Sequence, residues 1–348
     1  MRWVWCLRVR QDETLLLCSL LLGDISLKLA YNLHFISILY GAIMADTYAV
    51  ATQDFQSPID FIRFGLSRAN AATLHYGHGT DNAWDDILAL VLGSLFLPAS
   101  VDPLLLQAQL TTEEKALLCQ NLEKRIVERV PVPYLTHEAW FSGLTFYVDE
   151  RVLIPRSPIA ELIGHHFSPW IEGDRVERIL DLCTGGGCIA IACCHAFPDA
   201  QVDAVDISSD ALTVAEMNRQ RHHVQDQLTL IQSDCFDAVP NMQYDVIVSN
   251  PPYVGSDEMQ TLPEEYRHEP VLALETGNNG LAIVEKILHQ AHHYLTEQGI
   301  LIVEVGNSEQ ALMDAYPDVP FTWLDFEHGG QGIFLLTSQQ IKQYFGAK

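Results

Sequence analysis

The residues with the clearest chemical potential are four in a row, Asn250, Pro251, Pro252 and Tyr253. They follow an apolar run over 244–249 that predicts a buried strand, and the carboxyl ends of strands are where open parallel sheets bind ligands. Each proline fixes its own φ at about −65° and holds the residue before it in an extended conformation. We therefore expect the side-chain oxygen of Asn250 and the carbonyl oxygen of Pro251 to point in fixed directions, as two acceptors for a planar NH2 group.

Two acceptors aimed at one NH2 group suit methyl transfer to an amide or aryl nitrogen. The lone pair of such a nitrogen is delocalised, so positive charge builds on it as it attacks, and nearby oxygens stabilise that charge and hold the nitrogen in line. We predict catalytic roles for Asn250, Pro251 and Tyr253, and target binding by all four residues, with Tyr253 packing against the flat group. The alternative is a loop with a stiff bend and no chemistry.

A second signal is the stretch Cys183-Thr184-Gly185-Gly186-Gly187, between a predicted strand and a predicted helix. Glycines let the backbone approach a ligand closely, and the free N–H groups at a helix start attract an anion. Asp206 ends the next strand, where an acid can accept hydrogen bonds from ribose hydroxyls. The pair predicts a nucleotide-type site, although the spacing is not the G-x-G-x-x-G of nicotinamide folds. A tight turn that only packs helix on strand is the alternative.

Composition narrows the class of partner. The 348 residues include 45 Asp and Glu against 20 Lys and Arg, a formal charge of −25, which argues against a broad phosphate-binding surface and favours a basic partner. With 48% hydrophobic and 19% charged residues, disorder is excluded. The eight cysteines form no CxxC pair, so they indicate reduced thiols of a cytoplasmic protein and no zinc site.

The elements that must position these residues predict an α/β fold. Beyond Arg156, strands and helices alternate, which is typical of a doubly wound parallel sheet. The predicted strands cover 178–182, 201–205, 228–232, 244–249, 299–305, 322–326 and 333–337. Only a Gly329-Gly330 turn separates the last two strands, so we expect an antiparallel pair at one sheet edge.

The chain before this sheet is predicted to have three parts. Residues 1–43 are interpreted as a non-native or unstructured extension upstream of a start at Met44, because they make a poor signal peptide and a poor membrane span. Residues 44–136 carry helical periodicity for three helices, the third capped at Thr111 or Thr112. Residues 137–156 alternate with period two and predict a hairpin around an Asp149-Glu150 turn. The sheet domain then spans 157–348.

With these motifs the sequence resembles the S-adenosylmethionine-dependent protein N(5)-glutamine methyltransferases. Supporting stretches are 76–82, 146–158, 262–270 and 316–323, and the likeness extends from about Met44 to the C-terminus. Within the family the chain is similar to the branch acting on large-subunit ribosomal protein three. The release-factor branch, an alternative, typically has Pro-Arg-Pro-Glu where this chain has Pro155-Arg156-Ser157-Pro158. The resemblance implies a seven-stranded, Rossmann-like methyltransferase domain with a small N-terminal helical domain and a connecting β-hairpin.

The resemblance also implies a cofactor site for S-adenosyl-L-methionine. The methionine part would lie along 183–187, the ribose on Asp206 beside Ile207, and the adenine near Asp234 and Cys235. Asn250 would border this site, with the target glutamine held by 250–253. Asp181 is assigned chiefly to bracing the loop and less to direct contact. The chain departs from the family at Cys183, which replaces the first loop glycine. It departs from the release-factor branch at Cys235, where that branch has an aromatic residue.

Other groups stay open as alternatives. The histidine pairs at 165–166, 222–223 and 292–293 are expected on solvent-facing helices, with no metal site. Glu264, Glu265 and Glu269 either receive a cationic peptide or form a solvated face. For the whole protein, a nucleic acid amino methyltransferase would require a basic stripe, and a non-catalytic assembly factor would be insensitive to loss of Asn250. We expect a basic ribosomal protein as partner, with no direct nucleic acid or membrane binding; the sequence gives no oligomeric state.

Overall fold

The computed structural model describes residues 53–277, 279–327 and 329–346, and those from Gln56 onward belong to one compact unit. The predicted extension over 1–43 and the start at Met44 lie outside the described residues. No helix in the described part of the chain is both long and apolar enough to cross a membrane.

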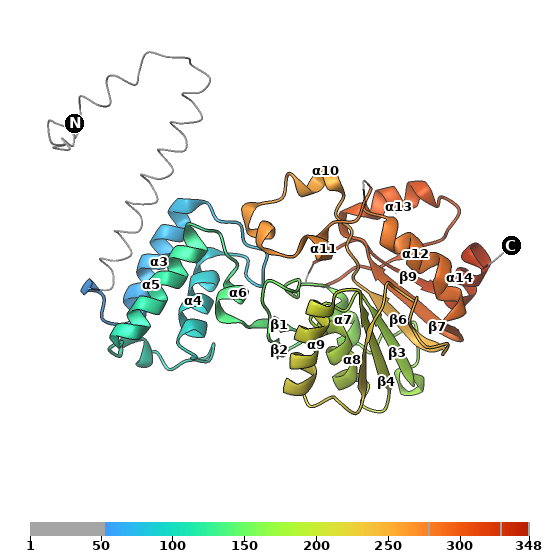
Figure 1. Ribbon diagram of the computed structural model, residues 1–348, viewed down its shortest axis with the longest axis horizontal. Coiled ribbons are helices and arrows are strands. Elements are labelled where there is room, and N and C mark those ends of the chain that lie inside the picture. Colours follow the sequence, from blue (N-terminus) through green and yellow to red (C-terminus); the bar gives the residue numbers. More distant parts are fainter. Residues whose placement is uncertain (1–52, 278, 328, 347–348) are drawn as a thin grey trace, which may run out of the picture. The chain divides into compact units, whose positions relative to one another are not determined.

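A seven-stranded sheet forms the core of this unit, in the order β5-β4-β3-β6-β7-β9-β8 (Figure 1). The first five strands in this order pair in parallel with their neighbours, whereas β9 runs antiparallel to both β7 and β8. The predicted fold class and the antiparallel pair at the sheet edge are thus confirmed. The strand bounds are β3 Arg178–Leu182, β4 Gln201–Asp206, β5 Leu228–Gln232, β6 Tyr244–Ser249, β7 Leu295–Glu304, β8 Thr322–Trp323 and β9 Ile333–Thr337.

Two predicted strands have different lengths in the structure. The strand expected over 299–305 begins four residues earlier, at Leu295, because Tyr244 of β6 pairs with Leu295 before a register shift. The strand expected over 322–326 shrinks to Thr322–Trp323, since only these two residues pair with β9. Neither difference moves the carboxyl ends of β3, β4 and β6, which carry the candidate site.

Helices cover both faces of the sheet, as the alternating strand residues require. Ile179 and Val246 belong to a core cluster shared with α8, whereas their neighbours Leu180 and Ile247 belong to a second cluster shared with α12 and α14. The helices after the hairpin are α7 Ile159–Gly164, α8 Cys188–Ala196, α9 Ser209–Arg221, α10 Ser256–Met259, α11 Val271–Leu274, α12 Ala282–Gln290, α13 Glu309–Ala315 and α14 Ser338–Phe345, with short 3-10 turns between some of them.

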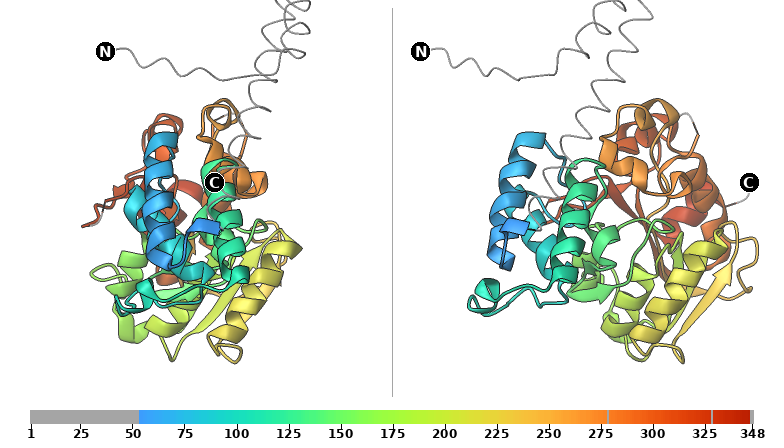
Figure 2. Two further views of the ribbon diagram at one scale, coloured as in Figure 1. Left: turned by 90° about the vertical axis from the view of Figure 1, so that its left-hand side faces the viewer. Right: turned by 60° about the vertical axis from the view of Figure 1, so that its left-hand side comes forward.

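The three predicted N-terminal helices are present as α3 Pro58–Ala72, α4 Ala83–Ser94 and α5 Thr112–Ile126, and α3 contacts the other two. Thr111 caps α5 through a capping box with Glu114, as predicted. A short fourth helix, α6 Val132–Thr136, follows. Figure 2 shows the segment after β6, in orange, next to these helices, and hydrogen bonds from His75 to Glu265 and from His268 to Glu128 join the two.

The hairpin exists, but the predicted turn at Asp149-Glu150 is wrong. The strands are β1 Ala139–Phe141 and β2 Leu144–Phe146, joined by Ser142 and Gly143. Both turn residues have positive φ, 50° and 75°, the pattern of a two-residue hairpin turn. Asp149 instead binds Arg151 through both carboxylate oxygens. The segment over 147–154 contains no strand or helix and connects the hairpin to the candidate site.

Candidate functional site

The loop from β3 to α8 is built from left-handed backbone. Cys183, Gly185 and Gly187 have φ of 60°, 55° and 82°. A Cβ at Gly187 would lie 3.3 Å from Ala215 Cβ, so this glycine packs α8 against α9. Gly187 does not line the cavity described below, in contrast to the other four loop residues. Cys183 adopts a conformation that favours glycine, which explains why a glycine would be expected there.

Asp181 lies beneath this loop and is completely buried. Its Oδ2 atom accepts hydrogen bonds from Thr184 Oγ1 at 2.6 Å and from the Ala190 backbone at 3.1 Å, whereas Oδ1 has no partner in the described chain. Burial raises the pKa of Asp181 to about 7. The structure therefore places Asp181 as a brace for the loop, outside the cavity wall.

Asp206, at the end of β4, fixes the loop from the other side. Its Oδ2 atom accepts from the Gly185 N–H at 2.8 Å, and its Oδ1 atom accepts from the Ser208 N–H at 2.9 Å. Burial raises its pKa, although these two hydrogen bonds oppose the change. The carboxylate thus lies at the carboxyl edge of the sheet with further lone pairs for hydroxyl donors.

An inner cavity of about 250 Å³ opens above this edge. Asp206 and Asp234 supply carboxylates to its wall, and Ile207 and Leu272 supply apolar surface although they are 51% and 58% exposed. Such exposed aliphatic surface inside a concave site suits a flat apolar ring. Nine of the predicted cofactor residues line this cavity: Cys183, Thr184, Gly185, Gly186, Asp206, Ile207, Asp234, Cys235 and Asn250.

Three cysteines, Cys183, Cys188 and Cys235, line the cavity. A hydrogen bond with Cys235 and burial raise the pKa of Cys183 well above its usual value. Cys235 is buried, with a φ of 49° that turns the backbone just after Asp234. Lys286 approaches Asp234 Oδ2 at 3.0 Å and so fixes the position of this half-exposed carboxylate.

The bend over 250–253 follows β6 directly and is anchored at Tyr253. The Tyr253 hydroxyl donates to Glu304 Oε1 at 3.0 Å, and the Ser308 hydroxyl donates to the Tyr253 carbonyl at 2.9 Å. A Cβ at Gly306 would lie 2.5 Å from the Tyr253 ring, so the ring lies directly on backbone there. Glu304 also accepts a short hydrogen bond from Ser157, and burial raises its pKa.

A second cavity of about 150 Å³, here called the outer cavity, also borders this bend. Pro251 and Tyr253 line the outer cavity, Pro252 lines the inner one, and Asn250 lines both. Leu153, Arg156 and Ala273 are also common to the two walls. Asn250 therefore stands where a group in one cavity meets a group in the other.

Arg156, in the wall of the outer cavity, forms an ion pair with the buried Glu269 that sequence reasoning did not find. Arg156 donates to Glu269 Oε1 at 2.6 Å and Oε2 at 2.9 Å, and its guanidinium lies 5.2 Å from the centre of the Tyr266 ring. His78 approaches Glu269 Oε2 at 3.4 Å. Burial would raise the pKa of Glu269, but His78 and Arg156 lower it to about 2.

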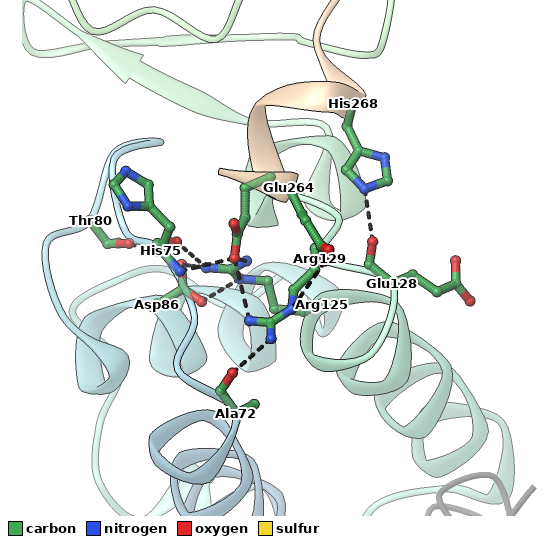
Figure 3. A network of polar contacts seen from close by, with 10 residues as sticks. Ala72, His75, Thr80, Asp86, Arg125, Glu128, Arg129, Glu264 and His268 are labelled. Atoms are coloured by element: carbon green, nitrogen blue, oxygen red, sulfur yellow. Dashed lines mark hydrogen bonds and ion pairs between the residues drawn. The ribbon is translucent and has the colours of Figure 1, made fainter. Parts of the chain in front are cut away.

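The expectation for the acidic stretch after the bend is wrong for Glu265 and Glu269, which form neither a peptide-binding nor a solvated face. Glu265 is 3% exposed and lies 3.5 Å from Arg125 and 3.6 Å from Arg129. Arg125 also binds Asp86 at 2.7 Å, and Figure 3 shows this network between the helical region and the segment after β6. Only Glu264 is solvent-facing, with a 66% exposed side chain.

Other motifs lie away from the cavities. Cys193 and Cys194 are core thiols of α8, as expected. His222 Nε2 donates to the Thr145 carbonyl at 2.8 Å and the ring packs against Phe146, so His222 supports the hairpin. Within the described ranges, no three His, Cys, Asp or Glu side chains gather as a metal site.

A buried amide also escaped sequence reasoning. Asn218 of α9 is fully buried, binds the backbone of Tyr147 through both side-chain atoms, and donates to the Gly186 carbonyl at 2.8 Å. It thereby joins the glycine loop to the segment after the hairpin. Nothing in its sequence neighbourhood signals this role, because its partners are 32 and 71 residues away.

Comparisons with known proteins identify methyltransferases as relatives of this chain. A family model described as a methyltransferase small domain matches residues 165–266. A ribosomal protein uL3 glutamine methyltransferase of Francisella tularensis subsp. tularensis is 48% identical over 286 residues, 82% of this chain and 91% of that protein. One of Xanthomonas campestris pv. campestris is 50% identical over 293 residues, 84% of this chain and 95% of that protein. The chain belongs to the family of ribosomal protein uL3 glutamine methyltransferases.

Proposed function

We propose that this protein transfers a methyl group from S-adenosyl-L-methionine to the side-chain nitrogen of a glutamine in ribosomal protein uL3. The observation that carries the proposal is the position of Asn250 in the common wall of two cavities. A donor held in the inner cavity and a carboxamide held in the outer cavity would meet at this residue. The names of the two relatives supply the substrate.

The inner cavity has the groups that the cofactor requires. Asp206 offers acceptors for the ribose hydroxyls, the loop over 183–186 offers backbone close to the methionine part, and Ile207 offers an apolar surface beside the adenine. Asp234 and Cys235 would border the adenine ring. Bound S-adenosylmethionine supplies a methyl group activated by a sulfonium.

The bend provides positioning and charge stabilisation. Asn250 Oδ1 and the Pro251 carbonyl would accept the two N–H groups of the target carboxamide and stabilise the positive charge that develops on nitrogen. No strong base is required before transfer, because the nitrogen loses its proton only after the new N–C bond has formed. Tyr253, held by Glu304 and Ser308, would pack against the flat carboxamide.

Charge supports a basic partner. The chain carries a net charge of −25, which steers a cationic ribosomal protein toward it and disfavours nucleic acid. We assign substrate selection to the helical region over 44–136, with the hairpin region over 137–156 as a connection and 157–348 as the catalytic domain. We expect the reaction to take place in the cytoplasm.

The test is incubation of the purified chain with methyl-labelled S-adenosylmethionine and, in separate reactions, uL3, a peptide-chain release factor and ribosomal RNA. Mass mapping of labelled uL3 should find one added methyl group on a glutamine side chain. Label confined to the release factor or to RNA would overturn the substrate assignment. Absence of label everywhere, with cofactor still bound, would favour a non-catalytic binding protein.

A further inference from the structure

Arg156 is held in one orientation by groups that use only part of its hydrogen-bonding capacity. Its Nη1 and Nη2 atoms donate end-on to the two oxygens of Glu269, at 2.6 and 2.9 Å. Nη1 also donates to the Ile154 carbonyl at 3.3 Å. The guanidinium face lies over the Tyr266 ring. A bidentate contact and a stacked face together fix both the plane and the direction of the group.

Two N–H groups of Arg156 are left for a further partner. A guanidinium has five N–H groups, and three of those of Arg156 have acceptors. The Nε–H and the second Nη2–H have no acceptor among the described residues, and these two lie parallel on one edge of the group. They form a second fork that suits an oxygen atom.

Arg156 borders the proposed reaction site. Arg156 lines both cavities, together with Asn250, and its side chain is 23% exposed. Burial would lower its pKa, but Glu269 raises it above the usual value, so the group stays charged. A charged donor thus borders the same space as the oxygens of Asn250 and Pro251.

A glutamine carboxamide has both kinds of group that this wall can recognise. Its nitrogen offers two donors, which the bend can accept, and its oxygen accepts hydrogen bonds. Without a donor for that oxygen, burial of the carboxamide would leave it unpaired, at a cost comparable to a lost hydrogen bond. A donor on one side and acceptors on the other also exclude the flipped carboxamide.

On the basis of the proposed function, we propose that Arg156 is a specificity-determining residue that donates from its free fork to the oxygen of the target carboxamide. Glu269 is then a positioning residue, because it acts on the target only through Arg156. The contact forms on binding and persists during transfer, so its loss should raise KM more than it lowers kcat. Cofactor binding should not depend on it.

The test is Arg156→Lys, which keeps the charge opposite Glu269 and removes the planar fork. We expect kcat/KM for uL3 to fall by about 10- to 100-fold, mainly through KM, the effect of one hydrogen bond to a charged donor. The dissociation constant for S-adenosylmethionine should stay within about twofold. Arg175→Lys is the matched control, because Arg175 forms an exposed ion pair with Glu172 and lines neither cavity.

An unchanged kcat/KM in Arg156→Lys, or an equal weakening of cofactor binding, would overturn the inference. If this variant does not fold, Glu269→Gln carries the test, since it keeps the shape and one acceptor but loosens the guanidinium. There we expect about a 3- to 10-fold loss of kcat/KM with unchanged cofactor affinity, and no loss would overturn the inference. Failure of the wild-type protein to methylate glutamine would instead contradict the proposed function.

Discussion

The Tyr253 hydroxyl lies 3.0 Å from Glu304 Oε1, so the last residue of the bend after β6 is joined to the last residue of the neighbouring strand β7. Glu304 is 6% exposed and accepts a second hydrogen bond from Ser157, which precedes α7. Three segments distant in sequence are therefore fixed together beside the outer cavity.

Removal of that hydroxyl should loosen the bend. In Tyr253→Phe, Glu304 loses one buried hydrogen bond, and we expect the free energy of unfolding to fall by about 1–3 kcal/mol. The methylation rate should fall several-fold because the bend is less well oriented. Urea unfolding and steady-state kinetics measure the two effects. Tyr316→Phe is a suitable control, since among the described residues its hydroxyl forms one hydrogen-bond contact, with His289 at 3.4 Å. Equal losses in both variants would contradict the role of Tyr253.

Loss of the amide at Asn250 should slow methyl transfer and leave the affinity for the cofactor nearly unchanged. In Asn250→Ala one acceptor for the target nitrogen disappears, so we expect kcat to fall by at least about 100-fold. Calorimetric titration should give a dissociation constant for S-adenosylmethionine within a few-fold of the wild-type value. The exposed Asn241 provides the control variant Asn241→Ala. A variant at Asn250 that retained wild-type kcat would refute the catalytic assignment.

The buried Asp181 should make stability depend on pH. Its pKa is about 7 in the folded protein, against 3.8 as the ordinary value, so the folded state holds a proton that the unfolded state releases. The resulting stabilisation is complete below about pH 4 and is lost as pH rises to about 7. In Asp181→Asn this loss disappears, and we expect the stability difference between variant and wild type to change by about 2–4 kcal/mol over that window.

Unfolding titrations at several pH values between 4 and 8 measure this difference. The comparison with wild type cancels the contributions of Asp206 and Glu304, whose pKa values burial also raises. Parallel stability curves for the two proteins would show that Asp181 is ionised throughout the range.

Substitution of the buried Glu265 should lower stability much more than substitution of its exposed neighbour Glu264. In Glu265→Gln, the buried Arg125 retains Asp86 but loses one anion, and we expect a loss of about 2–3 kcal/mol. Glu264→Gln, at an exposed site with a 4.0 Å contact to Arg129, should change stability by less than about 0.5 kcal/mol. Thermal unfolding of the two variants distinguishes these outcomes, and a similar effect of both would argue against the network.

Local constraints explain how much of the fold and site could be predicted from the sequence. The strand before Asn250 and the bend after it depend on apolar periodicity and on two prolines, all within ten residues, and the structure places them as expected. The sheet class and its antiparallel edge also follow from the order of segments. The predicted cofactor residues 183–186 and 206–207 line one cavity because parallel strands end at the same edge.

The features that were missed depend on distant partners. Glu269 looks like a surface residue in sequence, yet its carboxylate binds Arg156, 113 residues away. The hairpin turn was misplaced because the alternation of apolar residues continues past the true turn at Ser142-Gly143. The Ser-Gly dipeptide is itself a turn signal and could have located the turn. Burial and ion pairing at such positions arise only after the chain has packed.

The shared wall formed by Leu153, Arg156, Asn250 and Ala273 has a consequence for inhibitor design. A single compound that carries an adenosyl moiety and a carboxamide, linked through a short spacer, would occupy the inner and the outer cavity at once. Because the second moiety then binds without losing translational freedom again, such a bisubstrate compound should be held more tightly than either fragment alone.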